Sequence, residues 1–282
     1  MTPTLTAPVP CTVIDQRRLY EHYRSVPDPA AYAELVRMED EWITALGRAY
    51  EEEAPDFATS ADVLKAMREF LVAEARAATD NHRYLATEAT REEFEYVVRE
   101  FAVDGLTESL SLLAVVPKLP YRSGMAVFRV LIDELGCGNE AMAHAQLYRD
   151  LLTELGMPLD LDSYRDIGPE SYAYVNLFHW IANRAPVPEY FLGGYAYFEA
   201  SVLYGLQSFA HAAQRLGITN HQYYTEHIYI DKFHSKQMRT AIREAETAAG
   251  LDLAKVWAGV RMTSAVVTHA TETAISRARG LV

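Results

Sequence analysis

The sequence predicts an all-α protein folded as a single domain. Apolar residues recur every three or four positions through most of residues 30–279, which is the period of a helix with one buried face. Glycines and prolines interrupt this pattern, and no segment alternates apolar and polar residues as a half-buried strand would. No stretch is rich enough in glycine or serine to act as a linker between domains. We therefore expect one bundle of about eight or nine helices over 30–282, after an irregular lead-in over 1–29.

The first half of the chain is expected to hold five helices, over 30–52, 60–79, 90–113, 122–135 and 139–155. Before them, five prolines within the first 29 residues disfavour regular structure. Ser60 is a candidate N-cap for the second helix, and the third ends before Pro117. The turn between the last two is rich in glycine, so Gly138 suits a left-handed C-terminal cap and Asn139 suits an N-cap.

Four more helices are expected in the second half, over 170–183, 187–216, 221–249 and 253–279. Pro186 and Pro188 separate the first two, because proline cannot donate the backbone hydrogen bond of a helix interior. Gly217 and Gly250 mark the remaining joints, since glycine readily adopts the left-handed conformation that ends a helix.

Charge and cysteine content exclude several classes of protein. Thirty-nine acidic against 26 basic residues give a net charge of −13, which repels nucleic acids and anionic membranes. Cys11 and Cys137 alone cannot form a disulfide framework or a paired zinc site. The proline-rich start lacks the pattern of an export signal, and no apolar run approaches the roughly 18 residues of a membrane span. We expect a cytoplasmic protein with neither a nucleic-acid nor a membrane partner.

The segment 226–234 places metal-binding residue types on one helical face. His227, Asp231 and His234 are spaced i, i+4 and i+7, so at about 100° per residue they lie within roughly 60° of one another. Two imidazoles and a carboxylate on one face form half of a site for a first-row transition metal. The alternative is a polar face with coincidental histidines, since Lys232 and Gln237 indicate that part of this helix is exposed.

Acidic and imidazole side chains also lie on apolar faces of other segments. Glu199 lies among tyrosines, valine and leucines, and a buried carboxylate costs several kcal/mol unless it meets a cation. Glu134 ends a face of valine and leucine, and a glycine turn places His144 beside it. Glu140 competes as a ligand, although an acid in a first helical turn is already favoured by the helix dipole. Glu108 is the central acid of an otherwise apolar helix. Each inward acid could instead be a hydrogen-bonded core residue.

Taken in order, these residues resemble the pattern of the haem-oxygenase-like diiron oxidases and oxygenases. The pattern combines an ELGxG block, a histidine ten residues after its glutamate, and an HxxxDxxH block. The two blocks together are specific, and the resemblance covers about residues 80–240, with the closing helix expected from the overall architecture. It implies a haem-oxygenase-like helical bundle and seven iron ligands, Glu108, Glu134, His144, Glu199, His227, Asp231 and His234.

Three related classes fit the sequence less well. Ferritin-like diiron proteins need two Glu-x-x-His motifs, and none of the nine histidines here follows a glutamate at that spacing. A thiaminase-type hydrolase of this fold uses a cysteine nucleophile, but Cys137 lies in a glycine turn. A haem oxygenase needs an axial histidine near its N-terminus; His22 is available, but a haem site would leave the inward acids unexplained.

Oxygen and nitrogen ligands without thiolate favour iron or manganese. The resemblance implies two Fe(II) ions, O2 as co-substrate and an external electron donor. It also implies three chemistries: oxygenation of an amine nitrogen, cleavage of a C–C bond, or desaturation. Seven ligands with three histidines are similar to the set of the N-oxygenating members. We expect N-oxygenation of a small amine or amino acid, to a hydroxylamine or nitro compound, in a specialised biosynthetic pathway. An oxidative lyase or desaturase acting on an amino or fatty acid is the alternative.

A function from another class stays open: a metal-free helical binding protein whose inward acids are hydrogen-bonded in the core. Residues that bind the substrate are harder to identify from the sequence than metal ligands. Tyr195, Tyr224 and Tyr229 neighbour the expected ligands, and Arg261 or His269 could meet a substrate carboxylate. A homodimer is compatible with the sequence.

Overall fold

The computed structural model describes residues 9–77 and 80–282, and within these ranges the chain is helical and contains no strand. The all-α fold class is thereby confirmed. The first eight residues of the expected lead-in, and the end of the expected helix 60–79, lie outside the described residues. Within the described part, no helix combines the length and apolar content needed to cross a membrane.

Thirteen α-helices lie in the described ranges, more than the eight or nine expected. In chain order they are α1 (Gln16–Tyr23), α2 (Pro29–Glu39), α3 (Ala45–Glu52), α4 (Ser60–Arg76), α5 (Asp80–Thr87), α6 (Arg91–Glu100), α7 (Ala102–Thr107), α8 (Tyr121–Glu134), α9 (His144–Glu154), α10 (Pro169–His179), α11 (Glu189–Arg215), α12 (Gln222–Ala249) and α13 (Leu253–Ala278). Shorter segments join them, among them the 3-10 helices η3 (Leu110–Lys118), η4 (Gly136–Gly138) and η5 (Glu140–Met142).

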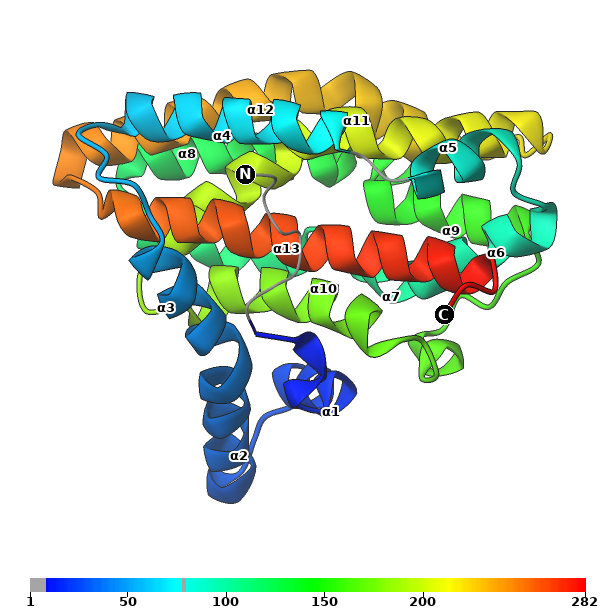
Figure 1. Ribbon diagram of the computed structural model, residues 1–282, viewed down its shortest axis with the longest axis horizontal. Coiled ribbons are helices and arrows are strands. Elements are labelled where there is room, and N and C mark those ends of the chain that lie inside the picture. Colours follow the sequence, from blue (N-terminus) through cyan, green and yellow to red (C-terminus); the bar gives the residue numbers. More distant parts are fainter. Residues whose placement is uncertain (1–8, 78–79) are drawn as a thin grey trace.

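The three longest helices form the centre of the bundle. α11 packs against both α12 and α13, and α8 packs against α12. Figure 1 shows α13 running lengthwise across the molecule with α10 beside it, while α2 extends away from the bundle. The contacts among α8, α11 and α12 bring together three of the segments that carry inward acids.

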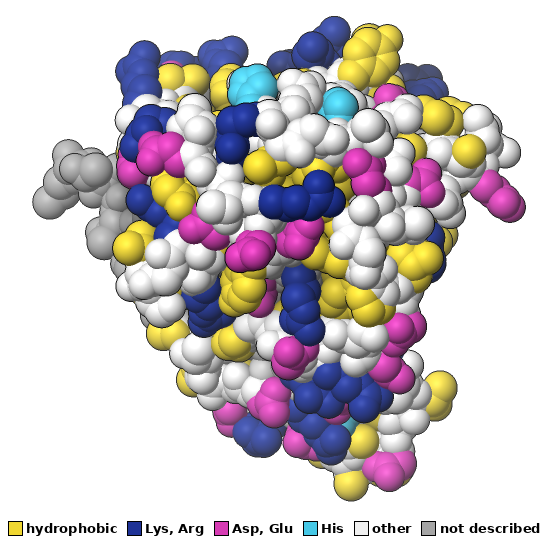
Figure 2. Space-filling model, turned by 90° about the vertical axis from the view of Figure 1, so that its right-hand side faces the viewer, with side chains coloured by type: hydrophobic (Ala, Val, Ile, Leu, Met, Phe, Trp, Pro, Cys, Tyr) yellow, Lys and Arg dark blue, Asp and Glu magenta, His cyan; other side chains and the backbone are white. Residues whose placement is uncertain are grey.

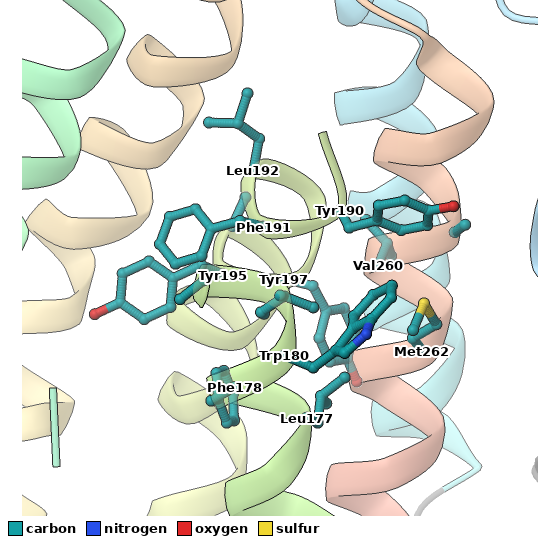
Figure 3. Close-up of a cluster of buried hydrophobic side chains, with 14 of the residues drawn as sticks. Leu177, Phe178, Trp180, Tyr190, Phe191, Leu192, Tyr195, Tyr197, Val260 and Met262 are labelled. Atoms are coloured by element: carbon teal, nitrogen blue, oxygen red, sulfur yellow. The ribbon is translucent and has the colours of Figure 1, made fainter. Parts of the chain in front are cut away.

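A cluster of aromatic and aliphatic side chains fills the space between α10, α11 and α13. Trp180 and Tyr190 meet edge to face with ring centroids 5.4 Å apart, and Val260 and Met262 are fully buried beside them. Figure 3 shows Tyr195 at one side of this cluster with its hydroxyl pointing away from it. Tyr195 therefore lies at the edge of this cluster, one helical turn before Glu199.

Glycine permits the close approach of α11 and α13. A Cβ atom at Gly193 would collide with the carbonyl oxygen of Val256, and one at Gly259 would collide with that of Tyr190. Both neighbours are backbone atoms, which cannot rotate away as a side-chain end could. The two helices can therefore pack this closely only because these positions have no side chain.

Gly193→Ala is expected to lower the free energy of unfolding by about 3 kcal/mol, because the helices must separate to admit the methyl group. Gly205→Ala in the same helix is the matched control. A methyl group there would meet no described atom within 4 Å, so better helix propensity should raise stability by up to about 1 kcal/mol. Urea unfolding followed by circular dichroism measures both. Equal effects of the two substitutions on stability would contradict the conclusion that the close packing of α11 and α13 depends on glycine at position 193.

The lead-in was expected to be irregular, and this is wrong for residues 16–23, which form α1. The Asp15 side chain accepts a hydrogen bond from the Arg18 backbone amide and caps the helix, and Leu19 is fully buried. α1 packs against α10, so a tertiary contact stabilises a helix too short to persist alone.

Other boundaries differ from those expected where the helix geometry changes. The segment 30–52 is divided into α2 and α3 by a π-helical turn at Asp40–Thr44. The N-cap of α4 is Thr59, whose side chain forms a capping box with Asp62, so Ser60 is the first helical residue. The segment 90–113 is broken into α6, α7 and η3, and the segment 139–155 becomes η5 and α9. α5 was not expected as a separate helix.

Candidate metal centre

The seven residues expected to bind iron lie together inside the bundle, as two groups of four that share one carboxylate. Glu108, Glu134, His144 and His227 form the first cluster, and Glu134, Glu199, Asp231 and His234 form the second. Within each cluster the ligand atoms, one per residue, lie within 4.8 Å of one another. The sequence thus identified side chains that the fold brings to one place.

Four helices and one helix end position these side chains. Glu134 is the last residue of α8, and His144 is the first of α9. Glu199 comes from the middle of α11, while α12 supplies His227, Asp231 and His234 from one buried face. Glu108 follows the last residue of α7, where the helix ends.

The helical geometry is interrupted at Ser109, whose backbone is left-handed with φ 62°. A non-glycine residue in this conformation costs roughly 1–2 kcal/mol, and such strain persists where surrounding contacts hold it. Here the Ser109 hydroxyl donates a hydrogen bond of 3.2 Å to Oε2 of Glu134. The break therefore ends α7 at Glu108 and fixes the shared carboxylate at the same time.

A second tight turn places His144 beside Glu134. Gly136 has φ 75°, and a Cβ atom there would lie 2.6 Å from the backbone nitrogen of Ala143, so glycine is required. This turn brings Nδ1 of His144 to 2.8 Å from Oε2 of Glu134. Gly138 is also left-handed, as expected, but its surroundings are open.

In the first cluster, ring nitrogens of two histidines and a carboxylate face one another at short distances. Nδ1 of His227 lies 2.7 Å from the carbonyl oxygen of Tyr223, to which only an N–H can be donated. Nε2 of His227 therefore faces the site, 3.1 Å from Oε1 of Glu108 and 3.0 Å from Nδ1 of His144. Oε2 of Glu108 is buried and has no hydrogen-bond partner among the described residues. A cation between these atoms would satisfy all of them.

The second cluster gathers three carboxylates around one imidazole. Nδ1 of His234 lies 3.1 Å from Asp231, 3.2 Å from Glu199 and 3.2 Å from Glu134. One N–H cannot serve three acceptors, and neither carboxylate oxygen of Asp231 accepts a hydrogen bond within the described structure. On the far side of the ring, Nε2 of His234 lies 3.4 Å from Asp133. This contact is not a hydrogen bond, so Nε2 of His234 is also buried without a hydrogen-bond partner among the described residues.

Burial makes this concentration of acids costly without a cation. Glu134, Glu199 and Asp231 are each at most 4% exposed. Burial and the neighbouring Asp231 raise the pKa of Glu199 to about 7, and burial also raises the pKa of Asp231. Burial opposes ionisation of Glu134 too, but His144 and His234 hold its pKa well below the usual range. Nitrogen and oxygen donors without thiolate, with unpartnered buried oxygens, suit a first-row transition metal such as iron.

A cavity of about 390 Å³ reaches the first cluster. Glu108 and His227 line its inner end, and Tyr204, 56% exposed, lies toward the surface. A smaller space of about 40 Å³ adjoins it and is lined by residues of both clusters. Sequence reasoning missed Asp104, which lines both spaces. The available signal was its position one helical turn before Glu108 in an apolar segment.

The other candidate residues are divided by the structure. Tyr195 lines the smaller space and Tyr224 lines the cavity, whereas Tyr229 is 59% exposed. Arg261 lies over the rings of Tyr50 and Phe70 and does not line the cavity.

Three further candidates lie apart from the clusters. Cys137 is exposed in its turn, and Glu140 is exposed at the start of η5. His22 pairs with Glu34, so it takes no part in the site.

On the face of the molecule drawn in Figure 2, acidic side chains do not gather as they do in the two clusters. Figure 2 shows the end of the molecule near α5, α6 and α9, where acidic and basic side chains are interspersed. The acids of the two clusters therefore stand out by burial, since the surface in this view is of mixed charge.

Comparison with known proteins gives two matches. A family described as iron-containing redox enzymes matches residues 95–267, a range that contains all seven candidate ligands. A nitrosourea synthase of Streptomyces achromogenes subsp. streptozoticus is 27% identical over 146 residues. That alignment covers 51% of this chain but 31% of the relative, so the chain corresponds to about a third of that protein.

Proposed function

Because the chain belongs to the iron-containing redox enzymes, we propose that it is an O2-dependent diiron oxygenase that oxidises the nitrogen of a small amine. The observation that carries the proposal is Glu134, whose carboxylate belongs to both clusters. A carboxylate can bind one metal ion through each oxygen, and the two oxygens of Glu134 face different histidines, Oε2 toward His144 and Oε1 toward His234. Two adjoining tetrads of this kind suit two ions.

The reaction balances as an amine plus O2, two electrons and two protons giving a hydroxylamine and water. Two ferrous ions, when bound, supply the two electrons to O2, and an external donor restores them. Repetition on the same nitrogen would lead toward a nitro compound. The proposed partners are therefore a small amine and an electron donor.

The residues of the chain orient the ligands and exclude water. The Tyr223 carbonyl accepts a hydrogen bond from Nδ1 of His227 and so directs Nε2 of that ring into the site. In His234 it is Nδ1 that faces the carboxylates of the second cluster. The Ser109 hydroxyl holds the shared carboxylate. Aromatic rings from α9 to α12 surround the cavity, so a bound substrate would be largely withdrawn from solvent.

N-oxygenation is favoured over the alternatives by the relative named for forming a nitrosourea, since that name implies chemistry at nitrogen. An oxidative lyase or desaturase could use the same ligands and is the second candidate. A metal-free binding protein is disfavoured, because in that case the unpartnered oxygens of Asp231 and Glu108 would be buried without compensation.

Anaerobic titration with ferrous iron tests the metal content, and about two ions per chain are expected. The loaded protein is then mixed with O2, a reductant and a panel of amines, and the products are identified by mass spectrometry. Addition of one oxygen atom to an amine supports the proposal. A product with a shortened carbon chain would indicate an oxidative lyase. Failure to bind iron would favour the metal-free binding protein instead.

A further inference from the structure

The cavity beside the first cluster has an unusual charge composition. Its described lining includes four acids, Glu74, Asp104, Glu108 and Glu272, and no lysine or arginine. Glu108 is a candidate metal ligand, so away from the proposed ions a substrate carboxylate would lie beside the other three acids, with no lysine or arginine in the described wall to pair with it. Uncompensated burial of a charge of this kind is strongly unfavourable.

The basic residues nearest the cavity do not change this balance. Arg261 packs over two aromatic rings outside the lining. His82 does line the cavity, but burial lowers its pKa, and its Nδ1 is 3.0 Å from the Ser208 hydroxyl. His227 faces Glu108 and belongs to the first cluster.

Aromatic rings and small apolar or hydroxyl side chains supply much of the remaining wall, and the faces of aromatic rings attract cations. Tyr148, Tyr174 and Tyr223 surround the inner end of the cavity. An organic ammonium ion gains from ring faces in a desolvated space, whereas a carboxylate does not. The wall thus suits a cation with an apolar body.

Asp104 is the acid placed to receive such a cation. It lies one turn before Glu108 in α7, lines both the cavity and the smaller space, and interacts with the hydroxyl of Tyr174. It belongs to neither cluster, so it is not among the candidate metal ligands. A nitrogen held there would lie at the same end of the cavity as Glu108 and His227. An ammonium ion has no lone pair, so before oxygenation it would pass one proton to the Asp104 carboxylate.

We propose that the substrate is an organic amine cation without a free carboxylate, and that Asp104 binds its ammonium group. This inference rests on the proposed function and narrows it, because it excludes free amino acids as substrates. Asp104 is a substrate-binding residue in this account, and the specificity follows from the absence of a cationic partner in the described cavity wall.

The test uses amines paired with the amino acids that carry one extra carboxylate: phenethylamine with phenylalanine, cadaverine with lysine, and agmatine with arginine. Isothermal titration of the anaerobic iron-loaded protein measures binding without turnover. In at least one pair the amine is expected to bind at least tenfold more tightly than the amino acid. Tighter or equal binding of the amino acid in every pair, or no binding of any of the six, would overturn the proposal.

Asp104→Asn is expected to weaken binding of the preferred amine at least tenfold while leaving iron content unchanged. Asp56→Asn, at an exposed position, is the matched control and should bind the amine like the parent. Unchanged amine affinity in Asp104→Asn would overturn the role of that residue. Because no O2 is present, the outcome is separate from the proposed reaction: C–C cleavage of a bound amine would contradict N-oxygenation and leave the substrate class standing.

Discussion

Glu134→Ala is expected to remove both iron ions together, whereas Glu108→Ala should remove only one. Glu134 is the one residue that belongs to both clusters, so its loss leaves each with three ligand residues and separates the two metal positions. Glu108 belongs to the first cluster alone. Turnover should fall about a thousandfold or more in both variants, because the metal pair would no longer stabilise the transition state by several kcal/mol.

The measurement is the number of ferrous ions per chain after anaerobic loading and desalting. Glu140→Ala is the control, because this neighbouring glutamate is exposed and lies in neither cluster. It should retain both ions. Circular dichroism of the metal-free variants checks that the fold is intact. A Glu134→Ala chain that still holds one ion at parental affinity would show that the two positions are independent and that no carboxylate bridges them.

Much of this site could be predicted from sequence, because the spacing of residues along a helix determines which face of the helix each side chain lies on. An acid on an apolar helical face must point into the core, and this argument placed Glu134, Glu199 and Asp231 correctly without any knowledge of how the helices pack. The resemblance added which of these acids meet one another. The match to iron-containing redox enzymes confirms the family, and the all-helical structure confirms the fold class.

The remaining features depend on contacts that no local pattern encodes. α1 is stabilised by packing on α10, and the left-handed backbone at Ser109 is held by its surroundings, although serine does not favour that conformation. Asp104 went unrecognised because the cavity that it lines is formed by residues of several helices. The sequence shows an acid in an apolar segment, but the absence of lysine and arginine from the described cavity wall is a property of the assembled fold.

Metal-free Glu199→Gln is expected to be more stable than the metal-free parent at pH 8 and equal to it near pH 4.5. The pKa of Glu199 rises from an ordinary 4.5 to about 7 in the folded chain, because of burial and the neighbouring Asp231. Between these values the folded state binds more protons than the unfolded state, so the free energy of unfolding falls as pH rises. A pKa shift of this size lowers the free energy of unfolding of the parent by about 3 kcal/mol at pH values above 7. The glutamine variant does not lose this stability, because its side chain does not titrate.

Urea unfolding at several pH values between about 4.5 and 8, with chelator present, measures this difference, and titrating groups that do not contact Glu199 cancel between the two chains. Glu69→Gln, at a side chain 65% exposed, is the control and should follow the parent across the range. When both chains are saturated with ferrous iron, the parent should be more stable than Glu199→Gln. The cation offsets the buried charge of the glutamate, and glutamine is the weaker ligand. A difference that stays constant with pH would mean that Glu199 is a hydrogen-bonded core residue, and a Glu199→Gln chain that gains as much from iron as the parent does would mean the same.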